Sequence, residues 1–114
     1  MQRQALVNYC LTKEGAWSDE SSEGHLEVKA GDQPFALFGP ESGTLSLKCG
    51  QDGEEAEAWR KEYPDDVIIM PYLGHYGWNT FTIHGDIDET DFFRAIDTSY
   101  QDVKERNLLL DPEV

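Results

Sequence analysis

Side chains that could bind a metal or attack a substrate are few in this sequence, and they stand far apart. The histidines and cysteines are His25, His75, His84, Cys10 and Cys49. No two of them have a recognised ligand spacing, which a zinc site of converging ligands would show. A serine nucleophile would need a histidine base and a glycine-rich turn, and the sequence around Ser99 supplies neither. We therefore expect no metal, no cofactor and no enzyme activity.

Two acidic stretches contain the ligand types that hard cations prefer. The first consists of Asp86, Asp88 and Thr90. It matches the opening of a calcium loop, but Asp91 stands where such a loop needs glycine, so acids favoured at a helix N-terminus explain it better. The second consists of Asp19, Glu20 and Glu23. It lies in segment 18–24, which the composition predicts to be an exposed loop, and it is a candidate cation site.

An aromatic loop is the most suggestive surface segment. Between residues 71 and 78 the sequence concentrates Tyr72, His75, Tyr76 and Trp78. Aromatic side chains in a loop can stack on nucleic-acid bases or anchor a bound peptide. In the alternative interpretation Trp78 fills the core and the tyrosines cover a sheet edge, because large aromatic residues are usually buried. The loop alone does not decide between the two.

The composition restricts the partners that the chain could bind. Its 114 residues fit one domain, spanning 1–114, and hold 23 acidic against 9 basic residues, which gives a net charge of -14. This excess opposes binding to nucleic acids and anionic membranes. The longest apolar run, 67–70, is too short to cross a bilayer. We expect a monomeric cytoplasmic protein in which Cys10 and Cys49 are reduced and buried.

The apolar pattern in the first half changes from a helical to a strand period. Apolar residues at intervals of three and four predict an opening helix over 2–11. Alternation of apolar and polar residues then predicts a strand over 25–30. After a glycine-containing turn an extended pattern resumes over 33–38, and alternation predicts another strand over 44–49. These segments form a meander of at least three strands.

The second half repeats this change of period. Helices are predicted over 52–63 and 86–106, because each range begins with an aspartate followed three residues later by a glutamate. Strands are predicted over 67–70 and 78–84. The whole order predicts an α+β fold, in which an antiparallel sheet carries helices on one face, one at each terminus and one in the middle. The core residues expected to join the last strand to the last helix are Trp78, Phe92, Ile96 and Tyr100.

Four short motifs resemble a known family. They are Leu45-Ser46-Leu47-Lys48-Cys49, Tyr63-Pro64, Trp78-Asn79-Thr80, and Ser99-Tyr100 with Val103. In this order and spacing, over nearly the whole chain, they resemble the MmcQ/YjbR family. The resemblance implies a CyaY-like fold, similar to CyaY and frataxin, with an antiparallel sheet and helices on one face. It also implies a non-enzymatic protein, since the family carries a DNA-binding label with a wing-like strand arrangement and is not known for catalysis.

The sequence departs from the family where cations are expected. Family members tend to have a Gly-Lys pair before the Phe-Ala of the second hairpin strand, whereas this chain has acidic and neutral residues at 32–34. Members also tend to place basic residues before the Trp-Asn pair, whereas this chain has a histidine, a tyrosine and a glycine at 75–77. Both departures remove positive charge from the region that would approach a duplex.

Two functions therefore compete. If the chain contacts DNA or another partner as the family label implies, the expected exposed or half-exposed residues are Lys48, His75, Tyr76, Trp78 and Asn79. The alternative is a protein-interaction module whose acidic surface recognises a basic partner, and the charge favours it. A common face formed by Lys29, Lys48, Arg60 and Lys61 beside Trp78 would support nucleic-acid binding, and acids interleaved among these cations would oppose it.

Overall fold

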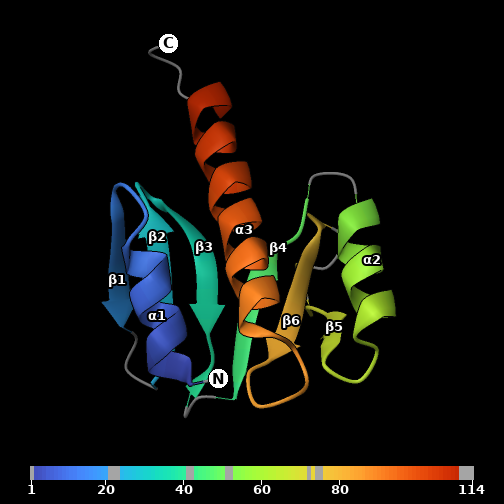
Figure 1. Cartoon of the computed structure of the whole chain (residues 1–114). Helices are drawn as coiled ribbons and strands as arrows, with labels where there is room; N and C mark the ends of the chain where they lie inside the picture. The colour runs from blue at the N-terminus through green and yellow to red at the C-terminus, as the bar shows by residue number, and fades with distance from the viewer. Residues whose placement is uncertain are drawn as a thin grey trace.

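A computed structural model shows three helices packed on a sheet of six strands (Figure 1). The structure describes residues 2–20, 24–40, 43–50, 53–71, 73 and 76–110, with side chains up to 105. The elements are α1 (Arg3–Leu11), β1 (Ala16–Glu20), β2 (Leu26–Ala30), β3 (Gln33–Phe38), β4 (Thr44–Lys48), α2 (Glu54–Glu62), β5 (Val67–Ile69), β6 (Trp78–Thr82) and α3 (Glu89–Leu110). The predicted α+β class is confirmed.

The sheet is antiparallel throughout, with strand order β1-β2-β3-β4-β6-β5. All three helices lie on one face of it (Figure 1). α1 packs on β1 and β2, α3 crosses the centre over β3 and β4, and α2 covers β5 and β6. The C-terminal half of α3 extends past the end of the sheet (Figure 1). We call this part of α3 the overhang.

The core lies between the helices and the sheet. A register shift in the β2–β3 pair places two successive residues, Phe35 and Ala36, in the core, as a β-bulge does. Phe92, Ile96 and Tyr100 on α3 are buried as the sequence predicts. Trp78 is also buried, at 7% exposure, but it lies outside the central apolar cluster.

The sequence predicts an exposed loop over 18–24, and its first three residues are exposed, but they belong to β1 rather than to a loop. Their pairing with β2 is regular, and Ser18 stands opposite Val28. β1 is an edge strand whose residues are almost all exposed, so no alternation of apolar residues marks it. Residues 21–23 lie outside the described residues.

Several predicted boundaries shift by a few residues. α2 begins at Glu54 after Gly53, which has a left-handed φ of 85°, while Asp52, the predicted cap, lies outside the described residues. β6 ends at Thr82 rather than at His84, and α3 continues to Leu110. No helix in the described part of the chain is long and apolar enough to cross a membrane.

Both cysteines are buried, as predicted, and neither forms a disulfide. Burial raises the pKa of the Cys10 thiol to about 12 and that of the Cys49 thiol to about 12. Each thiol therefore stays protonated at neutral pH, and a protonated thiol is a poor nucleophile and a poor metal ligand.

Candidate functional site

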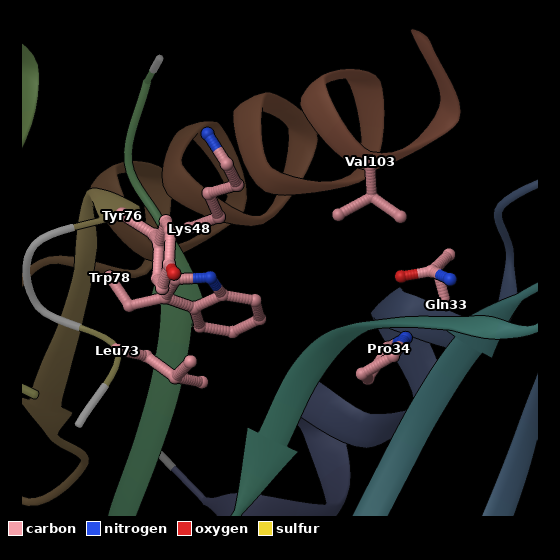
Figure 2. Close-up of a pocket in the computed structure, with 7 residues that line it drawn as sticks. All are labelled: Gln33, Pro34, Lys48, Leu73, Tyr76, Trp78 and Val103. Atoms are coloured by element: carbon pink, nitrogen blue, oxygen red, sulfur yellow. The ribbon is translucent and has the colours of Figure 1, made fainter. Parts of the chain in front are cut away.

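A cavity of about 300 Å³ opens at the end of the sheet where β3 and β4 separate, beneath the overhang of α3 (Figure 2). The residues that line it are Gln33, Pro34, Lys48, Leu73, Tyr76, Trp78 and Val103. They come from β3, β4, β6, α3 and the loop before β6. The walls are mostly apolar, and Figure 2 shows Gln33 across the open space from the Trp78 indole.

A serine from α3 stands between the two strands at this end. β3 and β4 pair directly from Phe38 opposite Leu45 to Ala36 opposite Leu47. One step further along this register, Phe35 would face Lys48. Instead, the Lys48 amide donates to Ser99 Oγ at 3.0 Å, and that hydroxyl donates to the Phe35 carbonyl at 2.6 Å. Ser99 thus replaces one direct bond of the ladder and holds the strands apart.

The Lys48 ammonium is bound by other groups of the protein. Its Nζ donates to the Gly50 carbonyl at 2.6 Å and lies 3.9 Å from Asp102 Oδ2. The same carboxylate oxygen accepts a hydrogen bond from the Gly50 amide at 2.9 Å. The side chains of Lys48 and Asp102 are only 4% and 13% exposed, so this ion pair is shielded from solvent. Figure 2 shows the Lys48 ammonium directed towards α3.

Gly77 fixes the loop that carries the aromatic residues. Its φ of 90° is left-handed, and a Cβ there would come within 2.7 Å of the Gly50 carbonyl oxygen. Its own carbonyl accepts a hydrogen bond from the Cys49 amide at 2.7 Å. Only glycine permits this close backbone approach. This contact fixes the backbone at Gly77 and therefore where its neighbours Tyr76 and Trp78 lie.

The structure brings together three of the five predicted contact residues. Lys48, Tyr76 and Trp78 line the cavity, whereas Asn79 does not, and His75 lies outside the described residues. The expected exposure is correct for Tyr76, which is 54% exposed, and wrong for Lys48 and Asn79, which are buried. Trp78 is buried too, which agrees with its prediction as a core residue rather than with its place in the exposed contact set.

The Asn79 side chain forms hydrogen bonds with two residues of α2. Its Nδ2 donates to the Ala56 carbonyl at 2.9 Å, and its Oδ1 accepts from Arg60 Nη1 at 2.6 Å. Successive strand residues point to opposite faces of a sheet, so Asn79 points away from the face of its neighbour Trp78. The motif that places the two side by side in sequence therefore separates them in space.

The two described members of the candidate cation site do not converge. Asp19 and Glu20 are successive residues of a strand, so their carboxylates point to opposite faces. Asp19 is also paired with Lys29, whose Nζ lies 3.1 Å away. Glu23 falls outside the described residues. Among the residues that the structure describes, no three His, Cys, Asp or Glu side chains form a group that could hold a metal ion.

The sequence-based prediction of contact residues missed the other lining residues and the polar groups of α3 beside the cavity, although one signal was present for α3. Ser99 and Asp102 stand at helical spacing beside Val103, so polar residues interrupt the apolar face of α3. Such an interruption indicates polar partners in the facing strands. Gln33, Pro34 and Leu73 carry no comparable signal.

Comparison with known proteins identifies the family. A family model described as YjbR matches residues 11–102, a range that includes Lys48, Ser99 and Asp102. The chain belongs to the YjbR family. This assignment confirms the resemblance that the four sequence motifs indicated.

One sequence relative and two solved structures are similar to this chain. The "Uncharacterized protein YjbR" of Escherichia coli K12 is 25% identical over 97 residues, which cover 84% of this chain and 81% of the relative. A Deinococcus radiodurans protein with the DUF419 domain matches with a TM-score of 0.79 at 21% identity, over 91% of this chain and 79% of that one. A Pseudomonas syringae protein matches with a TM-score of 0.73 at 18% identity, over 90% and 99%. The two structures support the fold alone.

Proposed function

We propose that this YjbR-family domain is a non-enzymatic interaction module that recognises a basic protein partner through its acidic surface. The observation that carries the proposal is that most of its described basic side chains are paired with carboxylates. Acidic residues outnumber basic ones by 23 to 9, and most described lysines and arginines have a carboxylate beside them. A phosphate would have to displace those carboxylates.

The cation pairs are distributed over the molecule. They are Lys13 with Asp97, Lys29 with Asp19 and Glu27, Lys48 with Asp102, Lys61 with Glu57, Arg94 with Asp91, and Lys104 with Glu14. Lys29 lies on β2, Lys61 on α2, and Lys48 is buried under α3. A duplex needs several cations aligned along its backbone, and interleaved acids oppose such a strip.

The acidic end of the domain is the surface best suited to a basic partner. It comprises the C-terminus of α2 with the segment that follows, and the loop before α3 with the first residue of that helix. We define it as Glu62, Asp65, Asp66, Asp86, Asp88 and Glu89. The Asp86 amide donates to Asp66 Oδ2 at 2.9 Å, and Tyr63 donates to Asp91, so the two segments are adjacent. Five of the six residues are exposed, with Asp66 partly buried. Charge complementarity of this kind speeds association and selects partners.

The non-enzymatic part of the proposal is supported by the state of the nucleophilic groups. The thiols of Cys10 and Cys49 have pKa values of about 12 and stay protonated. The Ser99 hydroxyl donates to a carbonyl and accepts from an amide, and Ser99 is fully buried. A serine nucleophile requires a base to take its proton.

Fluorescence anisotropy with two labelled probes, a lysine-rich peptide and a mixed-sequence DNA duplex, tests the proposal. At physiological salt and micromolar protein we expect saturable binding of the peptide and none of the duplex. At low salt any duplex binding should have a log-log salt slope of only about -2 to -3, because few phosphates can be neutralised at once. A sub-micromolar, sequence-selective duplex complex at physiological salt would overturn the proposal.

Matched charge variants locate the surface. The test variant combines Glu62→Gln, Asp65→Asn and Asp86→Asn in the acidic end, and the control combines Glu20→Gln, Asp32→Asn and Glu105→Gln elsewhere. Each removes the same charge from exposed positions. We expect the test variant to weaken peptide binding at least about fivefold and the control less than about twofold. Equal losses would show that only net charge acts.

A further inference from the structure

We infer that the cavity between β3 and β4 is a binding site for a small, flat, uncharged aromatic ligand. This inference goes beyond the proposed partner recognition and does not depend on it, because the acidic end lies in other segments of the chain. Three sets of observations support it: the walls of the cavity, the charges beside it and the way it is held open.

The walls fit a planar ring. Pro34, Leu73 and Val103 line the same cavity as the indole of Trp78, and Tyr76, which is half-exposed, lies at the same side as the indole (Figure 2). Aromatic rings bind one another in offset-stacked or edge-to-face arrangements, which favours a flat ligand next to an indole. The volume of about 300 Å³ lies at the lower end of the range for small-molecule sites, so the ligand has one or two rings.

The polar groups at the cavity favour a neutral ligand. The Lys48 ammonium is already engaged by the Gly50 carbonyl and by Asp102, so it adds little attraction for an anion. The net charge of -14 further opposes an anion. A cation would lack a counter-charge in the cavity, because no Asp or Glu is among the described lining residues and Asp102 is already engaged by Lys48 and the Gly50 amide. Gln33 lines the opposite side, and its amide can donate and accept hydrogen bonds to a polar atom on a neutral ring.

The cavity is held open by buried polar groups rather than left by loose packing. Ser99 is fully buried and stands between Lys48 and Phe35, where a direct strand-to-strand bond would otherwise form. Burying a hydroxyl and an ion pair costs free energy that an apolar seam would not cost. Local features that oppose stability in this way concentrate at binding sites.

Titration with a matched ligand series tests the inference. The probes are indole, its anionic analogue indole-3-acetate and its cationic analogue tryptamine, with cyclohexanol as a non-planar alcohol. Binding is followed by calorimetry and by the NMR signal of the Trp78 indole N–H. We expect saturable one-to-one binding of indole, with each charged analogue and cyclohexanol weaker by about tenfold or more. Absence of saturable indole binding, or tighter binding of a charged analogue, would overturn the inference.

Variants place the ligand in the cavity. Leu73→Trp fills the space and should abolish saturable binding of indole. Ile68→Trp is the matched control, because it adds the same ring at an exposed position on β5, and it should retain the wild-type affinity. Tyr76→Ala removes an exposed ring at the rim and should weaken binding about three- to tenfold without affecting folding. Unchanged affinity in both Leu73→Trp and Tyr76→Ala would contradict the placement.

Discussion

The two ends of the β3–β4 pair differ in the forces that position the strands. At the closed end, Phe38 pairs directly with Leu45, and Phe92 of α3 packs in the same apolar core. At the open end, the Ser99 hydroxyl stands between the strands, and Lys48 and Asp102 form a shielded ion pair beside it. Apolar packing brings strands together wherever it can, whereas directional polar bonds can keep them a fixed distance apart. The open end can therefore contain a cavity while β3 and β4 remain connected through Ser99.

The largest expected effect comes from breaking the closed end. Phe92 is fully buried, and its ring lies 6.1 Å from that of Phe81. Phe92→Ala should lower the free energy of unfolding by about 3 to 5 kcal/mol, because it removes apolar contacts and leaves a void. Urea denaturation followed by circular dichroism measures the loss. A loss under about 0.5 kcal/mol would show that the core does not depend on this helix face.

A smaller effect is expected at the open end. Ser99→Ala removes both hydrogen bonds and leaves the Lys48 amide and the Phe35 carbonyl without their partner. The expected cost is about 1 to 3 kcal/mol, and the Lys48 amide should exchange its hydrogen faster. Thr98→Ala, at the neighbouring half-exposed position, is the control and should change stability by less than about 0.5 kcal/mol. Equal effects of the two variants would mean that Ser99 does not hold the strands.

The smallest effect concerns a polar contact between Tyr63, the residue that follows α2, and the first turn of α3. The Tyr63 hydroxyl donates to Asp91, whose other oxygen accepts from Arg94 at 2.9 Å. The hydrogen bond to Asp91 raises the pKa of Tyr63 to about 12, and the bonds from Tyr63 and Arg94 lower the pKa of Asp91. Tyr63→Phe should cost only about 1 kcal/mol near neutral pH.

The pH dependence of that loss follows from the directions of the shifts. Because the folded pKa of Asp91 is lowered, its contribution is full above the ordinary carboxyl pKa of about 3.9 and is lost as pH falls through the folded value. Because the folded pKa of Tyr63 is raised, its contribution is full below about pH 10 and is lost as pH rises towards about 12. The stability difference between wild type and Tyr63→Phe should therefore be constant between these limits and shrink outside them. A difference that varies across neutral pH would contradict this assignment.

The sequence predicts the closed end well because its signals are local. Alternation of apolar and polar residues identifies β2 and β4, an extended pattern after a turn identifies β3, and helical spacing identifies the buried face of α3. β1 escapes prediction because an edge strand exposes nearly every residue and needs no apolar alternation.

The open end cannot be predicted in the same way because its contacts are not local. Lys48 lies 51 residues from Ser99, and Ser99 lies 64 residues from Phe35. Sequence alone gives Lys48 as an exposed cation, whereas the fold buries it against Gly50 and Asp102. The aromatic loop leads to the right region, since Tyr76 and Trp78 both line the cavity. Asn79 shows the limit of a short motif, because adjacent strand residues face opposite sides.

NMR detection of couplings across hydrogen bonds tests the central claim most directly, namely that a side chain holds β3 and β4 apart at one end. At the closed end the Gly39 amide donates directly to the Thr44 carbonyl at 3.1 Å, so a coupling between these two backbone groups should be observed. At the open end the Ser99 hydroxyl intervenes, so no coupling should connect the Lys48 amide nitrogen with the Phe35 carbonyl carbon. A clear Lys48–Phe35 coupling in the wild-type protein would mean that the strands pair directly and would contradict the account.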